Sequence, residues 1–209
     1  MQLDGMIFDL DGTLTDTFRV CFAAFREPLR PITGRTHTDD EIMARFGPSE
    51  AGILQRWVPN RGEECLRLYL AAYAREHRRM ARTFPGVETA LGCLEARGVR
   101  LAVITGRGPH STAISLERFG LAPYCDRVEI GSSGGAIKPR CIGVHPLAAA
   151  WDERSAAGAL RARYPLAVFE TVPQCVEWIE TTVEPRTRAP ARSGAAGSTD
   201  PPPSPGAGR

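Results

Sequence analysis

The sequence predicts an α/β fold, in which helices cover a parallel sheet and a separate helical block is inserted near the N-terminus. Short apolar runs at residues 5–9 and 100–104 each lead into polar residues and glycine, a pattern typical of buried strands. After residue 83, helical and strand patterns alternate, which indicates a parallel sheet. Between residues 17 and 82 only helical patterns occur.

The inserted block is predicted to contain four helices, over residues 17–29, 39–45, 50–57 and 63–82. Thr38 and Glu41 form a capping-box pattern at the start of the second helix. The fourth helix has acidic residues in its first turn and arginines in its last turn, as the helix dipole favours. The block therefore contains good local signals for helices and none for strands.

Two further helices are predicted over residues 87–97 and 111–119, followed by Gly98 and Gly120 as helix-ending glycines. They alternate with strands at residues 100–104 and 127–130.

Composition limits the classes of function. The chain has 209 residues, is 43% hydrophobic and carries a formal net charge of +2, which suits a packed core. Residues 185–209 are rich in Pro, Gly, Ala, Ser and Arg, so we expect a disordered tail. This tail holds four arginines and one aspartate, so the remainder is nearly neutral and nucleic-acid binding is not expected. No membrane-length apolar run and no secretory signal occur in the sequence, which favours a cytoplasmic protein without a membrane partner.

The residues that suggest chemistry follow the first strand. Asp9 and Asp11 lie on a turn at the carboxyl end of that strand, where ligands bind in parallel sheets. One carboxylate can act as a nucleophile or metal ligand, and the other can donate and accept a proton. Gly12 permits a tight turn, and an ordinary Asp-Gly turn with solvated carboxylates is the alternative interpretation.

The octet at residues 9–16, DLDGTLTD, resembles the first motif of the haloacid dehalogenase-like (HAD) phosphohydrolase superfamily. The segments at residues 46–50 and 84–87 add a likeness to its phosphoglycolate phosphatase-like members with a helical cap. The resemblance implies a Rossmann-like core formed by residues 1–16 and 83–184. It also implies a helical cap formed by residues 17–82.

The same resemblance implies roles for individual residues. Asp9 would attack phosphorus and form an aspartyl-phosphate, while Asp11 would protonate the leaving oxygen and then activate water. Asp9 and the main-chain carbonyl of Asp11 would hold Mg²⁺. Thr105 and Gly106, which end the strand at residues 100–104, match the second motif and would bind the phosphate. Lys138 matches the third motif and would neutralise Asp9 and the phosphoryl group.

Lys138 is the only lysine among 26 basic Lys and Arg residues. Lysine is a compact point charge whereas arginine is a planar fork, so a single lysine in an arginine-rich chain suggests selection for that side chain. A surface lysine left by chance is the alternative. Its position between a glycine-rich loop and Pro139 favours the functional interpretation.

The fourth motif of the superfamily, an apolar strand ending in Gly-Asp and further acids that bind Mg²⁺, is missing. Residues 166–170 and 172–179 resemble the last strand and the final helix of the family. No Gly-Asp dipeptide follows Lys138, and the chain continues almost directly into residues 142–151, which resemble the strand that comes after the missing motif in the family. The core is therefore expected to lack about one helix-strand unit. Asp152 and Glu153, which follow that strand, are candidates for substitute metal ligands.

The functional prediction is a Mg²⁺-dependent phosphatase that acts on a small phosphorylated metabolite. A phosphomutase of the same superfamily is one alternative, because mutases use the same two acids. The other alternative is a truncated protein that is weakly active or inactive because the fourth motif is absent. The sequence leaves the substrate and the oligomeric state open, and Arg35, Arg45 and Arg56 are best explained as solvated helix faces.

Overall fold

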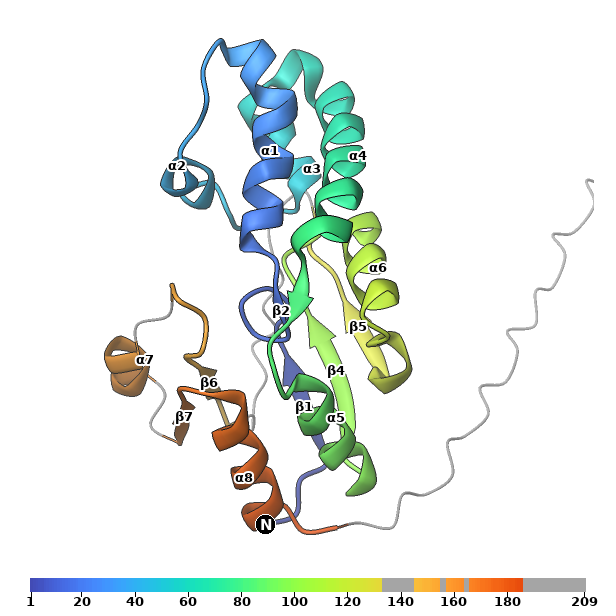
Figure 1. Cartoon of the computed structure of the whole chain (residues 1–209), viewed down its shortest axis with the longest axis vertical. Coiled ribbons are helices and arrows are strands. Elements are labelled where there is room, and N and C mark those ends of the chain that lie inside the picture. The colour runs from blue at the N-terminus through green and yellow to red at the C-terminus, as the bar shows by residue number, and fades with distance from the viewer. Residues whose placement is uncertain (133–144, 155–156, 164–165, 186–209) are drawn as a thin grey trace, which may run out of the picture.

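The computed structural model describes residues 1–132, 145–154, 157–163 and 166–185. Its main sheet has three parallel strands in the order β1-β4-β5 (Figure 1). The strands are β1 (Gly5–Phe8), β4 (Arg100–Ile104) and β5 (Arg127–Glu129). The predicted α/β fold with a parallel sheet is confirmed.

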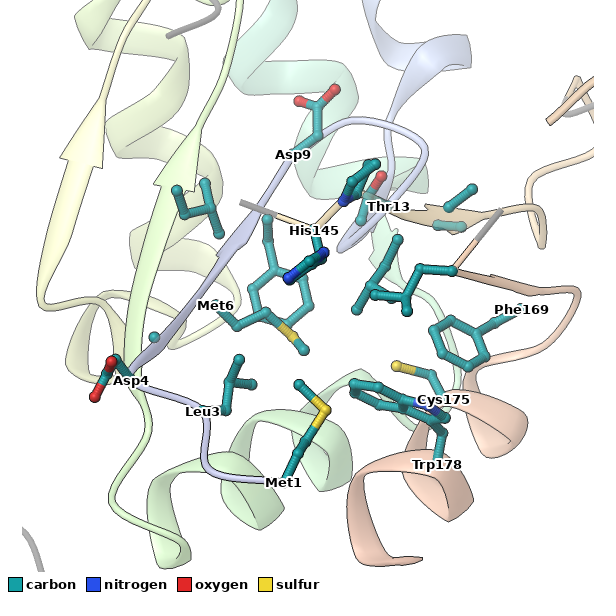
Figure 2. Close-up of a pocket in the computed structure, with 18 of the residues that line it drawn as sticks. Met1, Leu3, Asp4, Met6, Asp9, Thr13, His145, Phe169, Cys175 and Trp178 are labelled. Atoms are coloured by element: carbon teal, nitrogen blue, oxygen red, sulfur yellow. The ribbon is translucent and has the colours of Figure 1, made fainter. Parts of the chain in front are cut away.

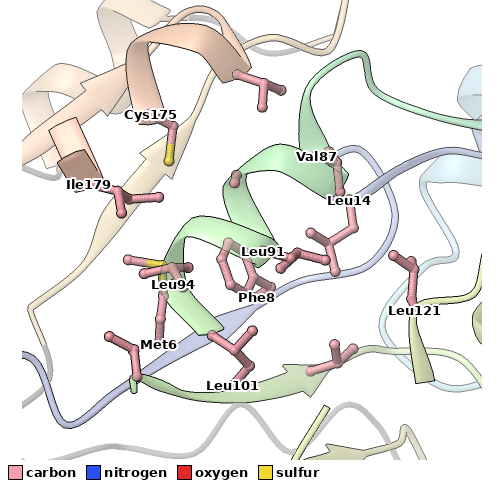
Figure 3. Packing of buried hydrophobic residues seen from close by; sticks show 14 of the residues in the cluster. Met6, Phe8, Leu14, Val87, Leu91, Leu94, Leu101, Leu121, Cys175 and Ile179 are labelled. Atoms are coloured by element: carbon pink, nitrogen blue, oxygen red, sulfur yellow. The ribbon is translucent and has the colours of Figure 1, made fainter. Parts of the chain in front are cut away.

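One hydrophobic cluster joins this sheet to the helices beside it (Figure 3). Met6 and Phe8 alternate with exposed residues along β1 and pack with Leu91 and Leu94 of α5. Helix α5 also packs on α8. Since burying a leucine contributes about 2 kcal/mol, this cluster is a main source of stability. The elements around it are α5 (Val87–Ala96), α6 (Pro109–Arg118), the short 3-10 helix Ala122–Tyr124 and α8 (Val172–Thr182).

The helical block has a hydrophobic cluster of its own, centred on fully buried aromatic residues such as Phe22, Tyr69 and Tyr73. It contains α1 (Phe18–Thr33), α2 (Asp39–Met43), α3 (Glu50–Trp57), the 3-10 helix Pro59–Arg61 and α4 (Gly62–Met80). The chain enters through β2 (Thr15–Asp16) and leaves through β3 (Arg82–Thr83), which pair antiparallel. This narrow double connection separates the block from the sheet (Figure 1).

Most elements agree with the sequence to within a few residues, and the predicted capping box of Thr38 and Glu41 forms with both hydrogen bonds. Helix α1 contains Pro28, extends past its predicted end at residue 29 through Pro31, and ends before Gly34 at φ 73°. Pro28 is buried in the block. Tertiary packing therefore outweighs the local cost of proline in the helix.

A second, two-stranded parallel sheet lies apart from β1 and contains β6 (Leu147–Ala149) and β7 (Ala167–Phe169), with α7 (Ala157–Arg163) between them in sequence. Within the described ranges, β1 pairs only with β4. A cavity of about 600 Å³ lies between β1 and the β6–β7 pair, lined by residues such as Phe169 and Trp178 (Figure 2). Loss of a helix-strand unit beside β1 would leave such a gap.

Two predictions fall outside the described residues. Lys138 lies within 133–144, and the tail prediction falls on 186–209. Among the helices that the structure describes, none combines the length and the apolar character that crossing a membrane requires.

Candidate active site at the carboxyl edge of the sheet

The pairing register of β1 and β4 brings the first two motifs to the same edge of the sheet. Phe8 of β1 pairs with Val103 of β4, and both strands run in the same direction. Asp9 and Thr105 therefore follow neighbouring strands at the same carboxyl edge. Asp9 is exposed there, and its Oδ1 accepts a hydrogen bond of 2.7 Å from the backbone N–H of Leu10.

The loop after Asp9 is fixed by its own backbone. The carbonyl of Leu10 accepts hydrogen bonds from the N–H groups of Leu14 and Thr15 and from the Thr15 hydroxyl. Gly12 has φ 75°, and a Cβ there would lie 2.7 Å from the ring of Phe18. Glycine is therefore required at this position for both its backbone conformation and the close packing of α1.

Asp11 points toward Arg107 rather than toward open solvent. The guanidinium of Arg107 donates two hydrogen bonds to the carboxylate, from Nε at 2.7 Å and from Nη2 at 2.8 Å. The side chains of Arg107 and Asp11 are only 7% and 16% exposed, so this is a largely buried, bidentate ion pair. The Thr17 hydroxyl also donates to Asp11.

The helical block surrounds the same guanidinium. Tyr69 accepts a hydrogen bond from Arg107, the Tyr73 ring lies 4.6 Å from its central carbon, and Cys21 contacts it. Burial would lower the pKa of Arg107, but Asp11 and its other neighbours outweigh burial and raise it well above its usual value. Burial raises the pKa of the Cys21 thiol to about 12, although Arg107 opposes that shift. Cys21 is therefore a neutral thiol here, whereas Arg107 is a permanent cation.

The second motif also has a defined backbone. The hydroxyl of Thr105 accepts a hydrogen bond from the N–H of Arg107, and Thr105 is buried while Gly106 is exposed. A hydroxyl that accepts one hydrogen bond can still donate another, for example to a phosphate oxygen. Gly131 lies so close that a Cβ on it would approach the Gly106 carbonyl to 2.2 Å. The loop that follows β5 therefore packs directly against Gly106 of the second motif.

A carboxylate from the helical block caps the helix that follows the second motif. Glu50 is only 6% exposed and accepts hydrogen bonds from the N–H of Gly108 at 2.8 Å and from the Ser111 hydroxyl at 2.6 Å. The N-terminus of α6 favours a negative charge, so Glu50 is stabilised there. Arg107 and Glu50 together link the helical block to the sheet edge through buried polar contacts.

These groups surround one cavity of about 340 Å³. Asp9, Asp11 and Gly106 lie at its sheet side, together with Arg107. Its other walls come from the helical block and are mostly aromatic or apolar: Phe18, Phe25, Phe46, Pro48, Ile53 and Tyr69. A cavity of this size can hold a small organic ligand.

The described residues do not fit a resident Mg²⁺ site of the kind that the resemblance implies. Nowhere in the described ranges do three or more His, Cys, Asp or Glu side chains gather as a metal ion would require. The Asp11 carboxylate is already paired with Arg107. Of the suggested substitutes, Asp152 accepts a hydrogen bond from the N–H of Arg154, and Glu153 forms an ion pair with Arg19. Among the described residues neither carboxylate forms a metal-binding group with Asp9 and Asp11, so the structure does not support the substitute-ligand hypothesis.

A family model described as haloacid dehalogenase-like hydrolase matches residues 6–148, which is more than half of the chain. This chain belongs to that family. The match begins within β1 and extends to β6, so it includes the helical block and both motifs of the site.

The curated relatives are similar over most of the chain. A phosphoglycolate phosphatase of Cereibacter sphaeroides is 29% identical over 159 residues, covering 72% of this chain and 73% of the relative. The protein described as tyrosine-protein kinase PtkA of Mycobacterium tuberculosis is 31% identical over 63% of this chain, but the match covers only 45% of that protein. This chain therefore corresponds to a part of the second relative.

Solved structures share the fold. A phosphoglycolate phosphatase described as putative, from Lactobacillus delbrueckii subsp. bulgaricus, has a TM-score of 0.64 at 20% identity, covering 86% of this chain and 99% of the other. A β-phosphoglucomutase described in the same way, from Thermotoga maritima, has a TM-score of 0.63 at 17% identity and covers 87% and 100%. Two other matched structures are similar over a shorter stretch, and the match covers 64% of each of them and 64% and 62% of this chain.

The structure brings Asp9, Asp11 and Gly106 together around one cavity and places Thr105 beside them. Lys138 is not among the described residues, so its contribution stays a prediction. Sequence reasoning assigned no role to Arg107 or Glu50, although Glu50 ends the segment 46–50 that carries the resemblance and Arg107 follows Gly106 directly. A signal for Arg107 was present, because a cation right after the second motif has an acidic neighbour at the same edge.

Proposed function

We propose that the chain is a phosphatase that hydrolyses a small phosphomonoester through an aspartyl-phosphate on Asp9. The observation that carries this proposal is the cavity that Asp9 and Asp11 share with Gly106 at the carboxyl edge of the sheet. Membership in the hydrolase family and the likeness to phosphoglycolate phosphatases support it.

In the proposed reaction a carboxylate oxygen of Asp9 attacks phosphorus, and the bond from phosphorus to the leaving oxygen breaks. Asp11 gives its proton to that oxygen and afterwards takes one from the water that hydrolyses the aspartyl-phosphate. Thr105 and the N–H of Gly106 bind the non-bridging oxygens, and Lys138 balances the charge. The bidentate contact with Arg107 requires Asp11 to leave that pair, at least in part, before it can carry a proton.

We propose further that residues 17–82 act as a cap over a core made of residues 1–16 and 83–184. In the described chain, the backbone passes between the two clusters through the paired strands β2 and β3, which suits a hinge. Arg107 and Glu50 would hold the cap against the core. The cytoplasmic location stays a prediction.

Mg²⁺ supplies charge neutralisation to phosphoryl transfer in such enzymes. Because the described side chains do not form a complete site for it, the proposed steps contain none that depends on the metal. The Asp9 carboxylate and the Asp11 main-chain carbonyl alone would give weak binding.

A protein that binds phosphomonoesters with little or no turnover is the second candidate. The observations that favour it are the pairing of Asp11 with Arg107 and the lack, among the described residues, of three side chains grouped as a metal ion would require. A phosphomutase has no such specific observation in its favour.

The decisive experiment measures phosphate release by the purified full chain from a panel of phosphomonoesters, with and without Mg²⁺. Asp9→Asn should lower the rate at least about 100-fold, because amide nitrogen and oxygen are poor nucleophiles. Asp40→Asn is the matched control on the exposed first turn of α2 and should leave the rate unchanged. Equal rates in the wild type and Asp9→Asn would exclude Asp9 catalysis, and binding without release would favour the second candidate.

A further inference from the structure

The cavity beside Asp9 has a largely aromatic wall on the side of the helical block. Phe18 and Phe46 are only partly buried, and their rings stack at 6.5 Å with 22° between the planes. Phe25 packs against Phe46 at 6.2 Å and against Tyr69 at 4.6 Å. The wall is therefore a connected set of aromatic rings from α1, α4 and the segment before α3.

The charged side chains Arg107 and Glu50 in the same wall already interact with other groups of the protein. Among the described residues that line the cavity, Arg107 is the single cation, and its three nitrogens all donate to Asp11, Tyr69 or Cys21. Glu50 adds a negative charge. A carboxylate on the ligand would meet this negative charge and would have to compete with Asp11 for Arg107, and desolvating it would be costly.

The arginines of the helical block do not line the cavity. Arg45 stacks over the Trp57 ring at 4.1 Å, and Arg35 forms a bidentate pair with Glu41. Neither is among the residues that line the cavity. Aromatic rings, by contrast, interact favourably with other rings in stacked or tilted geometries.

We infer that the organic part of the phosphomonoester bound at Asp9 is an aromatic ring without a carboxylate. This inference rests on the proposed function, because it assumes that the phosphoryl group lies at Asp9 and Gly106. The ring then lies against Phe18 and Phe46, and the committed charges of Arg107 and Glu50 discriminate against anionic leaving groups such as glycolate.

Calorimetric titration with non-hydrolysable phosphonates tests the inference on the full chain. Benzylphosphonate carries a ring, 3-phosphonopropionate carries a carboxylate, and inorganic phosphate carries neither. We expect benzylphosphonate to bind at least about tenfold more tightly than the other two probes. Phe46→Leu should weaken benzylphosphonate binding about three- to tenfold and leave phosphate binding unchanged.

Phe84→Leu is the matched control, because Phe84 is also half-buried but packs against Trp151 outside this cavity. It should bind all three probes like the wild type, and circular dichroism checks that both variants fold. The inference would be overturned if 3-phosphonopropionate bound as tightly as benzylphosphonate or more tightly, or if Phe46→Leu did not change benzylphosphonate binding. Phosphate binding in the same experiment would leave the proposed function standing. Failure of all three probes to bind would overturn the proposed function itself, and the inference with it.

Discussion

The two sides of β1 differ in how completely neighbouring strands and helices cover them. On one side, β4 pairs along the whole strand, and the helical block fastens onto the sheet edge through Arg107 and Glu50. On the other side, β6 and β7 stand apart across a cavity of about 600 Å³ (Figure 2). Ile7 on β1 is also 43% exposed, which is unusual for the strand that carries the candidate nucleophile.

This difference separates two parts of the chemistry. The proposed phosphate-binding residues Thr105 and Gly106 follow β4, the proposed proton-transfer acid Asp11 follows β1, and hydrogen bonds hold Thr105 and Asp11 in place. The sequence lacks the Gly-Asp motif whose acids would bind Mg²⁺ according to the family resemblance. In the proposed function, the side of β1 next to β4 would bind the phosphoryl group, while the described residues form no complete set of Mg²⁺ ligands.

The largest expected effect concerns packing on the two sides. Leu94→Ala should lower the free energy of unfolding by about 4 kcal/mol, because Leu94 is fully buried in the main cluster. Leu147→Ala in β6 should cost only about 1 kcal/mol, because Leu147 is partly buried and already borders the cavity. Urea denaturation measures both. Equal losses would show that the β6–β7 side is packed as tightly as the β4 side.

The second effect concerns the buried ion pair. Arg107→Met should destabilise the fold by about 3 kcal/mol, because it leaves Asp11 buried beside apolar groups without its partner. Arg82→Met is the matched control, since Arg82 pairs with Asp16 but is 74% exposed, and it should cost less than about 1 kcal/mol. If Arg107→Met loses no more stability than Arg82→Met, the ion pair does not fasten the helical block to the sheet.

The third effect is a pH dependence. His77 of α4 is fully buried beside Ser115 of α6, and burial, then Arg107 and Arg118, lower its pKa to about 4. The unfolded chain therefore binds a proton near pH 6.5 that the folded chain refuses until about pH 4. The contribution of neutral His77 to stability should be fully present above pH 6.5. The free energy of unfolding should then fall by roughly 2 kcal/mol as the pH approaches 4.

Thermal melts of wild type and His77→Gln between pH 7 and 4.5 measure this linkage. The variant should lose part of the slope, whereas His110→Gln, at an exposed position, should keep the wild-type slope. Parallel slopes in all three proteins would mean that His77 does not titrate in the way its burial requires.

The smallest expected effect concerns Mg²⁺. With only weak ligands available, 1 mM Mg²⁺ should add less than about 0.2 kcal/mol to the stability of the fold. A melting temperature unchanged by Mg²⁺ in both wild type and Asp9→Asn would agree with this. A clear rise in the wild type that Asp9→Asn abolishes would show that the site holds the metal despite the missing acids.

Local signals predicted most of the fold. The capping box of Thr38, the helix-ending Gly98 and the apolar run at residues 100–104 depend on neighbours in sequence, and the structure places each element as expected. The partners of Asp11 and the position of Glu50 depend on how the helical block lies on the sheet. Contacts between Arg107 and Asp11 span 96 residues, and no local pattern specifies them.

The central claim is that Asp9 forms the covalent intermediate, and borohydride trapping tests it most directly. The full chain is mixed with phenyl phosphate, quenched during turnover and reduced, which converts an aspartyl-phosphate into homoserine. We expect peptide mass spectrometry to find homoserine at position 9 of the wild type and none in Asp9→Asn. Phosphate release by the wild type with an unmodified Asp9 would contradict it.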